Sequence, residues 1–277
     1  MKFTKMQGAG NDFIVINNIE EQLSTEDFSG LAKKLCQRRM AIGADGLMVV
    51  EKPVEGGDFK MLFYNADGSL GEMCGNGARC IAKYGFENHL AGQTINIETT
   101  AGMVKAWKLD RINYKVRLND VSRLELNMEL EACGQVYSCA YVELGDPGIP
   151  HLGLEMKGLR TLTPAQLWTL GSALRCHPAL PKGANVNFYE ITGEDQVFER
   201  TFERGVEDFT YACGTGTGSV VAVLTEKGLC SGKNVKVSMT GGDLLIDVVK
   251  DKGRITDLYL SGPAVIVAEG ETGEIIG

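Results

Sequence analysis

Apolar residues recur at helical spacing in two stretches that occupy equivalent places in the first and second parts of the chain. The first stretch covers residues 28–35 and follows Ser24-x-x-Asp27, a start that resembles a capping box. The second stretch covers residues 167–174 and follows Thr163-Pro164-Ala165-Gln166, with Pro at the first helical position and Gln at the third. The spacing predicts two amphipathic helices. The apolar-face positions are Phe28, Leu31, Ala32 and Leu35 in one helix, and Leu167, Leu170, Gly171 and Leu174 in the other.

The pattern after each amphipathic helix also repeats, as two short strands, a glycine-rich turn and a second helix. The second helices are predicted at 75–89 and 214–227, and residues 219–224 are apolar on nearly every face, which is typical of a buried helix. Three strand-like stretches follow each of these helices, and residues 264–268 are expected to pair with the first half. The strands predicted by alternation and apolar content are 46–50, 59–64, 95–98, 187–191, 196–202 and 235–238.

The repeated element order predicts an internal duplication. Cys213-Gly214 lies 139 positions after Cys74-Gly75, and Thr99–Gly102 matches Ser238–Gly241 at the same offset. We therefore expect an α/β fold of the α+β type with two pseudo-symmetric domains, each a curved, mainly antiparallel sheet around a buried central helix. The expected halves are residues 1–120 with 262–277, and residues 121–261.

Composition narrows the class of protein further. The 277 residues are 44% hydrophobic and 23% charged with a net charge of −8, which predicts a packed globular protein and argues against nucleic acid or acidic membranes as partners. Residues 1–6 lack a secretory h-region and no apolar run is long enough to cross a bilayer, so we expect a cytoplasmic protein. None of the 8 cysteines forms a C-x-x-C pair, so neither a metal site nor a disulfide framework is expected.

The most informative chemistry lies in two matching turns, Cys74-Gly75-Asn76-Gly77 and Cys213-Gly214-Thr215-Gly216. A thiol at a helix N-terminus typically has its pKa lowered to about 3.5–7.5. A single cysteine before a helix is usually structural, but the duplication favours an acid and a base acting on opposite faces of one carbon acid. Cys80, one and a half turns into the helix, is expected to be core.

The same turns offer an alternative to a cofactor. Backbone N–H groups at a helix N-terminus can bind a carboxylate and stabilise the negative charge that develops on it. No lysine stands out as a pyridoxal phosphate site, and Gly214-x-Gly216-x-Gly218 fits neither a Rossmann nor a P-loop fingerprint. We therefore expect no cofactor and no metal.

Several polar residues have both a plain and a functional interpretation. Arg204 suits a substrate carboxylate, although Glu203-Arg204 could also form an ordinary surface ion pair. His151 ends a Pro/Gly-rich stretch, where a solvated turn histidine is the commoner outcome, and it is a second-tier candidate together with Asp45. Asn11, Asn65 and Asn185 stand at strand or turn ends, where a turn role is the plain interpretation.

The chain resembles the diaminopimelate epimerase family, and the two cysteine motifs are shared in looser form with proline racemase relatives. The resemblance runs over most of the chain. The segments that carry it are 5–13 (KMQGAGNDF), 43–46 (GADG), 65–69 (NADGS), 74–80 (CGNGARC), 183–188 (GANVNF), 203–208 (ERGVED) and 212–216 (ACGTG).

The resemblance implies an epimerase that interconverts LL- and meso-diaminopimelate without pyridoxal phosphate, in a cleft between two domains. It implies Cys74 and Cys213 as the acid–base pair and a homodimer. The reacting carboxylate would lie between Gly75-Asn76 and Gly214-Thr215. The implied contacts to the distal amino-acid end are Asn65, Asn185, Arg204 and Glu203, with Asn11 lining the same cleft.

One position departs from the pattern. Many family members have Gly-Asn-Pro-His where this chain has Gly148-Ile149-Pro150-His151, and Ile149 cannot make the hydrogen bond of that Asn to the substrate. Two alternatives therefore stay open. One is a racemase of another amino acid, such as histidine, on the same fold, and the other is a non-catalytic metabolite-binding protein.

Overall fold

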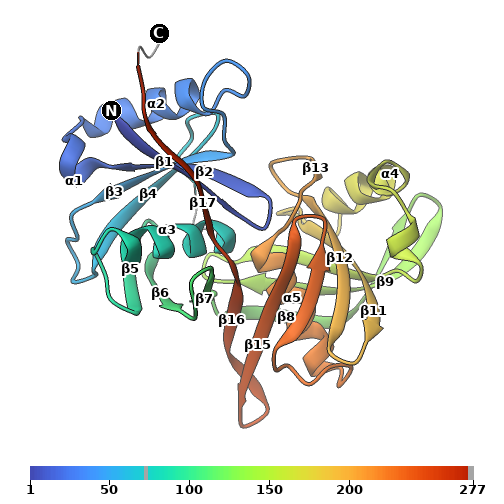
Figure 1. Ribbon diagram of the computed structural model, residues 1–277. Coiled ribbons are helices and arrows are strands. Elements are labelled where there is room, and N and C mark those ends of the chain that lie inside the picture. Colours follow the sequence, from blue (N-terminus) through green and yellow to red (C-terminus); the bar gives the residue numbers. More distant parts are fainter. Residues whose placement is uncertain (72–73, 274–277) are drawn as a thin grey trace. The chain divides into compact units, whose positions relative to one another are not determined.

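The computed structural model describes residues 1–71 and 74–273, which form two compact units (Figure 1). The first unit is Met1–Val116 with Gly262–Gly277, and the second is Arg117–Ser261. None of the helices in these described residues is long and apolar enough to cross a membrane.

The first unit is a curved sheet whose strands are mostly neighbours in sequence. β2 and β3 are parallel, as are β4 and β5, whereas β1–β2, β3–β4, β5–β6 and β6–β7 are antiparallel. The C-terminal strand β17 pairs antiparallel with β1, so the predicted pairing of residues 264–268 with the first half is confirmed. The strands are β1 (Lys2–Gly8), β2 (Asn11–Asn17), β3 (Gly46–Glu51), β4 (Phe59–Asn65), β5 (Thr94–Thr99), β6 (Gly102–Lys108), β7 (Asn113–Arg117) and β17 (Val265–Glu271).

Helix α3 (Gly75–Glu87) lies at the centre of the first unit and is buried from Gly75 to Gly85. It packs on β1, β2, β5 and β6, and a Cβ on Gly85 would lie 2.3 Å from the ring of Phe59. The other main helix of this unit, α2 (Phe28–Leu35), buries the predicted positions Phe28, Ala32 and Leu35. Before α2 come the short helix α1 (Asn18–Glu21) and a 3₁₀ turn, η1 (Thr25–Asp27), which Ser24 caps.

The second unit repeats the pattern of parallel and antiparallel pairs. β10–β11 and β12–β14 are parallel, while β8–β9, β9–β10, β11–β12, β12–β13, β14–β15 and β15–β16 are antiparallel. The strands are β8 (Val121–Ala132), β9 (Gln135–Leu144), β10 (Ile149–Glu155), β11 (Asn185–Gly193), β12 (Gln196–Glu203), β13 (Asp208–Phe209), β14 (Val235–Met239), β15 (Gly242–Asp251) and β16 (Arg254–Pro263).

The helices of the second unit correspond to those of the first. α4 (Pro164–Arg175) begins with Pro at its first position and Gln at its third, as predicted, and Thr163 and Gln166 form a complete capping box. It follows the 3₁₀ turn η2 (Leu159–Thr161). α5 (Gly214–Glu226) is the buried central helix, and residues 220–224 are all buried within it. The predicted fold class, a mixed fold of mainly antiparallel curved sheets with few helices, is confirmed. This architecture puts one cysteine at the start of each central helix.

Candidate functional site

Cys74 is the N-cap residue of α3. Its backbone is extended, with φ −103° and ψ 138°, and its Sγ accepts a hydrogen bond of 3.3 Å from the backbone N–H of Gly77. A sulfur that accepts from a first-turn N–H is held where the helix dipole favours negative charge. A Cβ on Gly77 would come within 2.5 Å of the Met48 side chain, which explains the second glycine of the turn.

Cys213 is the N-cap residue of α5 and is only 7% exposed. Its Sγ lies 3.6 Å from the hydroxyl of Thr215. Burial raises the pKa of the Cys213 thiol well above its usual value, and the charge of Glu203 adds to this effect. The lowered pKa that the helix N-terminus predicts is therefore wrong for Cys213, because burial outweighs the helix dipole. A Cβ on Gly216 would lie 2.2 Å from Oδ1 of Asn187 and 3.3 Å from this sulfur.

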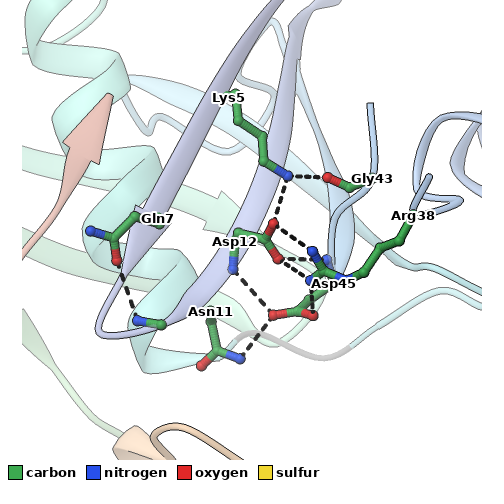
Figure 2. A network of polar contacts seen from close by, with 8 residues as sticks. Lys5, Gln7, Asn11, Asp12, Arg38, Gly43 and Asp45 are labelled. Atoms are coloured by element: carbon green, nitrogen blue, oxygen red, sulfur yellow. Dashed lines mark hydrogen bonds and ion pairs between the residues drawn. The ribbon is translucent and has the colours of Figure 1, made fainter. Parts of the chain in front are cut away.

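Three predicted site residues of the first unit are linked by hydrogen bonds. Nδ2 of Asn76 donates to Oδ1 of Asn11 at 2.6 Å. Nδ2 of Asn11 donates in turn to Oδ2 of Asp45 at 3.2 Å (Figure 2). Because Asp45 is a carboxylate and only accepts, the orientation of the Asn11 amide is fixed, and with it the oxygen that Asn76 contacts.

Next to Asn11, two cations and two carboxylates form a network, and three of its members, Lys5, Asp12 and Arg38, were not predicted as site residues (Figure 2). Asp12 accepts from Lys5 at 2.7 Å and from Arg38 at 2.5 Å, and Arg38 also bonds Asp45 at 2.8 Å. Burial alone would raise the pKa of Asp12, but hydrogen bonds and charges from Arg38 and Lys5 lower it. The only sequence signal was that Lys5 and Asp12 flank Asn11 in one motif.

Asn65 stands at the end of β4, where its side chain closes a turn. Its Nδ2 donates to the hydroxyl of Ser69 at 3.0 Å, and its backbone N–H donates to the carbonyl of Ser69 at 2.9 Å. Asn65 therefore has the turn role that is the plain interpretation of its position.

In the second unit, Asn185 and Arg204 lie together. The backbone N–H of Arg204 donates to Oδ1 of Asn185 at 2.8 Å, and Nδ2 of Asn185 donates to the carbonyl of Pro150 at 3.2 Å. Nη1 of Arg204 donates to the carbonyl of Lys182 at 3.0 Å. The charge of Glu203 acts on the thiol of Cys213. The predicted residues Asn185, Glu203 and Arg204 therefore lie at the start of β11 and the end of β12.

His151 does not lie in a solvated turn, and that expectation is wrong. It lies in β10, opposite Asn185 of β11, and is completely buried. Burial lowers the pKa of His151 to about 3, helped by the charge of Arg204, so the imidazole is neutral. Nδ1 lies 3.4 Å from Nδ2 of Asn187, while Nε2 is buried without a hydrogen-bond partner among the described residues.

A buried carboxyl group, Glu199 on β12, also lies in this unit and was missed. The residues of β12 alternate, so Val197, Glu199 and Thr201 are on the buried face. The alternation was visible in the sequence, but a glutamate at an inward position was not singled out. Across residues 1–71 and 74–273, no three His, Cys, Asp or Glu side chains gather as metal ligands would.

Comparison with known proteins identifies the family. The sequence profile described as "Diaminopimelate epimerase" matches residues 3–123 and 146–267. The diaminopimelate epimerase of Aquifex aeolicus is 36% identical over 287 residues, covering 99% of this chain and 98% of the relative. That of Carboxydothermus hydrogenoformans is 37% identical over 284 residues, covering 98% and 99%. The chain belongs to the diaminopimelate epimerase family.

Solved structures agree on the fold of this diaminopimelate epimerase family member. A probable proline racemase from Agrobacterium radiobacter K84 matches with a TM-score of 0.72 at 15% identity, covering 98% of this chain and 92% of that one. A phenazine biosynthesis PhzF family protein from Enterococcus faecalis matches with a TM-score of 0.70 at 15% identity, covering 99% of both chains. The predicted family and enzyme class, an isomerase, are confirmed.

Proposed function

We propose that the protein interconverts LL- and meso-diaminopimelate, with Cys74 and Cys213 as the acid–base pair and without a cofactor. The observation that carries the proposal is that each of these thiols is the N-cap of a buried central helix. The family membership and the names of relatives at 36–37% identity support the substrate.

The chemistry needs one thiolate and one thiol. The thiolate takes the α-hydrogen as a proton, which leaves a carbanion stabilised by the adjacent carboxylate. The other thiol then gives its proton to the opposite face of that carbon and becomes the thiolate. Each epimerisation therefore leaves one thiol and one thiolate, with their identities exchanged, and a second turnover in the reverse direction restores the first state.

The helix N-termini supply the electrostatic stabilisation. The first N–H groups of a helix point out of its N-terminus, so those of Gly75-Asn76 and Gly214-Thr215 can donate to the reacting carboxylate as negative charge accumulates there. One such donor is typically worth about 2.7–4 kcal/mol in a transition state. Several donors together can take the place of an electron-accepting cofactor.

The distal end of the substrate is a second amino-acid group. Arg204 provides a guanidinium for its carboxylate and Glu203 a carboxylate for its ammonium, while Asn185, Asn65 and Asn11 supply amides. Asn185 already holds the backbone of Arg204, so its role includes fixing that residue. The cytoplasmic location and the homodimer stay predictions from the sequence.

The proposal is tested by a stereochemical screen. The purified protein is incubated with LL-diaminopimelate and, separately, with single amino acids that include histidine, and products are separated by chiral chromatography. A Cys74→Ala/Cys213→Ala double variant is the matched control. We expect meso-diaminopimelate from the intact protein alone. Turnover of a different amino acid would instead establish the racemase alternative, and no turnover of any substrate would establish a binding protein.

A further inference from the structure

The carboxyl group of Glu199 is completely buried in the second unit, next to the helix that begins after Cys213. Its Oε2 lies 2.8 Å from the hydroxyl of Thr217, in the first turn of α5, and its Oε1 lies 3.4 Å from the hydroxyl of Thr201. Among the described residues, the side-chain partners of this carboxyl group are two hydroxyls, and burial of a carboxyl with so few partners costs free energy.

Counting hydrogens shows which form of Glu199 the arrangement favours. The Thr217 hydroxyl lies 2.9 Å from the carbonyl oxygen of Cys213, a backbone bond of the kind that threonine makes within a helix. That bond uses its single hydrogen, so the contact with Glu199 needs a hydrogen from the carboxyl group. Glu199 is then a neutral acid that donates to Thr217, which in turn donates to Cys213.

The contact between the other carboxyl oxygen and Thr201 is also consistent with a neutral Glu199. The Thr201 hydroxyl lies 3.0 Å from Oδ1 of Asn187, which can only accept. The hydrogen of Thr201 is therefore used on Asn187, and Glu199 receives no charge-stabilising donation from it. Ionisation of Glu199 would turn the Thr217 hydrogen towards the carboxylate and leave the Cys213 carbonyl with its backbone donor, the N–H of Thr217, alone.

We propose that Glu199 is a positioning residue for Cys213: as a neutral acid it holds the first turn of α5 through Thr217, and once ionised it opposes the thiolate form of Cys213. The proposal rests on the proposed function, because it explains how one of the two thiols keeps its proton. It concerns a residue that need not touch the substrate.

The titratable groups on β12 and on the strands β9, β10 and β11 of this unit keep their charge state near neutral pH. Tyr189 lies opposite Glu199 on β11, and burial raises the pKa of Tyr189 to about 12. Burial raises the pKa of Cys139, on β9, to about 11. His151 on β10 is neutral, and Glu203, further along β12, adds a charge that opposes the Cys213 thiolate.

Glu199 itself changes charge in the range where an epimerase of this kind would work. Burial raises the pKa of Glu199 to about 8, because the carboxylate loses more hydration than the neutral acid does. The charge of Glu199 in turn raises the pKa of Cys213. The two groups therefore avoid carrying negative charge at the same time, as two coupled acids do.

Cys74 is the internal control, because the charge that acts on its sulfur is positive, whereas the charges that act on Cys213 are negative. The guanidinium of Arg79, one turn further along α3, is fully buried and favours negative charge on the Cys74 sulfur. A change at Glu199 is therefore expected to move the titration of Cys213 more than that of Cys74.

The test follows the two thiols directly. Protein labelled with ¹³C at cysteine Cβ is titrated by NMR, and the Cys74 and Cys213 signals are assigned with the corresponding serine variants. In Glu199→Gln, which cannot ionise, we expect Cys213 to form its thiolate about one pH unit lower than in the unaltered protein. The Cys74 curve should move less than the Cys213 curve. Superimposable Cys213 curves would overturn the proposal.

Two threonine variants separate positioning from general damage to the helix. Thr217→Val removes the hydroxyl that joins Glu199 to Cys213 and keeps the side-chain shape. Thr225→Val removes an equivalent hydroxyl from the other end of α5, where it bonds the carbonyl of Val221 at 2.7 Å. We expect Thr217→Val to raise the pKa of Glu199, followed by ¹³C NMR of the labelled carboxyl, and Thr225→Val to leave it unchanged. Equal effects of the two variants would contradict the proposal.

A kinetic readout distinguishes positioning from a purely structural role. In the unaltered protein, kcat/KM for LL-diaminopimelate should fall at high pH as Cys213 loses the proton that it donates. In Glu199→Gln this fall should move to lower pH, in step with the Cys213 titration. A structural role would lower kcat/KM equally at every pH. If the unaltered protein does not turn over diaminopimelate, the proposed function fails, yet the NMR titration still decides whether Glu199 controls Cys213.

Discussion

Asn76, the second residue of α3, donates a 2.6 Å hydrogen bond to the side-chain oxygen of Asn11, which lies 65 positions earlier in the chain. Asn11 is held in turn by Asp45, and Asp45 by Arg38 (Figure 2). The residue that follows Gly75 at the start of the central helix is thus fixed by charges on distant loops.

Replacing Asp45 with Ala should weaken catalysis without unfolding the protein. The Asn11 amide loses the acceptor that sets its orientation, so Asn76 loses a fixed partner at the helix N-terminus. We expect kcat/KM to fall about tenfold, the equivalent of one hydrogen bond of about 1.4 kcal/mol. Asp110→Ala is the control, because Asp110 closes an exposed turn by bonding Ile112 and Asn113. Equal losses in the two variants would argue against a positioning role.

Arg204→Ala tests recognition of a second carboxylate. Loss of a charge-assisted contact should lower kcat/KM for diaminopimelate by about 10- to 100-fold. A substrate that lacks a distal carboxylate would be affected little. Arg254→Ala, at an exposed arginine that begins β16, serves as the control. Unchanged diaminopimelate kinetics in Arg204→Ala would remove this residue from the binding site.

His151 should make the protein sensitive to acid. The folded pKa of about 3 lies below the usual 6.5, so stability is complete above about pH 6.5 and is lost as pH falls towards 3. The free energy of unfolding, measured with urea, should decrease by up to about 1.4 kcal/mol per pH unit from this group. His151→Gln should flatten that slope, whereas His89→Gln, at an exposed residue, should not. Parallel slopes for all three proteins would contradict the buried neutral imidazole.

The contribution of Glu199 to stability should depend on pH in the opposite direction to that of His151. Its folded pKa of about 8 lies above the usual 4.5, so its contribution to stability is complete below about pH 4.5 and is lost as pH rises to 8. Between these limits, the unfolding free energy of Glu199→Gln should rise relative to the unaltered protein as the pH rises. Urea unfolding at pH 5, 6.5 and 8 measures the difference. A constant difference across that range would show that the carboxyl is ionised throughout.

Local sequence signals were sufficient for the elements that carry the thiols. Cys-Gly-x-Gly followed by apolar residues predicted α3 and α5 within two residues at their C-terminal ends, and continuous apolarity at 219–224 predicted burial. The strands at 46–50 and 187–191 were also found, each slightly longer in the structure. These features depend on neighbouring residues alone.

Features that depend on distant pairing could not be read from the chain. His151 is buried because β10 lies between β9 and β11, and its partner across β11 is 34 positions away. The Asp12–Arg38–Asp45 network likewise joins residues 26 and 33 positions apart. The pKa of Cys213 was predicted in the wrong direction because a helix N-terminus is visible in a sequence, whereas the depth of burial is not.

The two-thiol mechanism is tested most directly by following the α-hydrogen of LL-diaminopimelate in D₂O by NMR and mass spectrometry. The unaltered protein should form meso-diaminopimelate that carries deuterium at the inverted carbon. Cys74→Ser and Cys213→Ser should each abolish epimerisation, while Cys176→Ser, at an exposed cysteine, should retain it. Epimerisation at a near-normal rate by either of the first two variants would contradict the account.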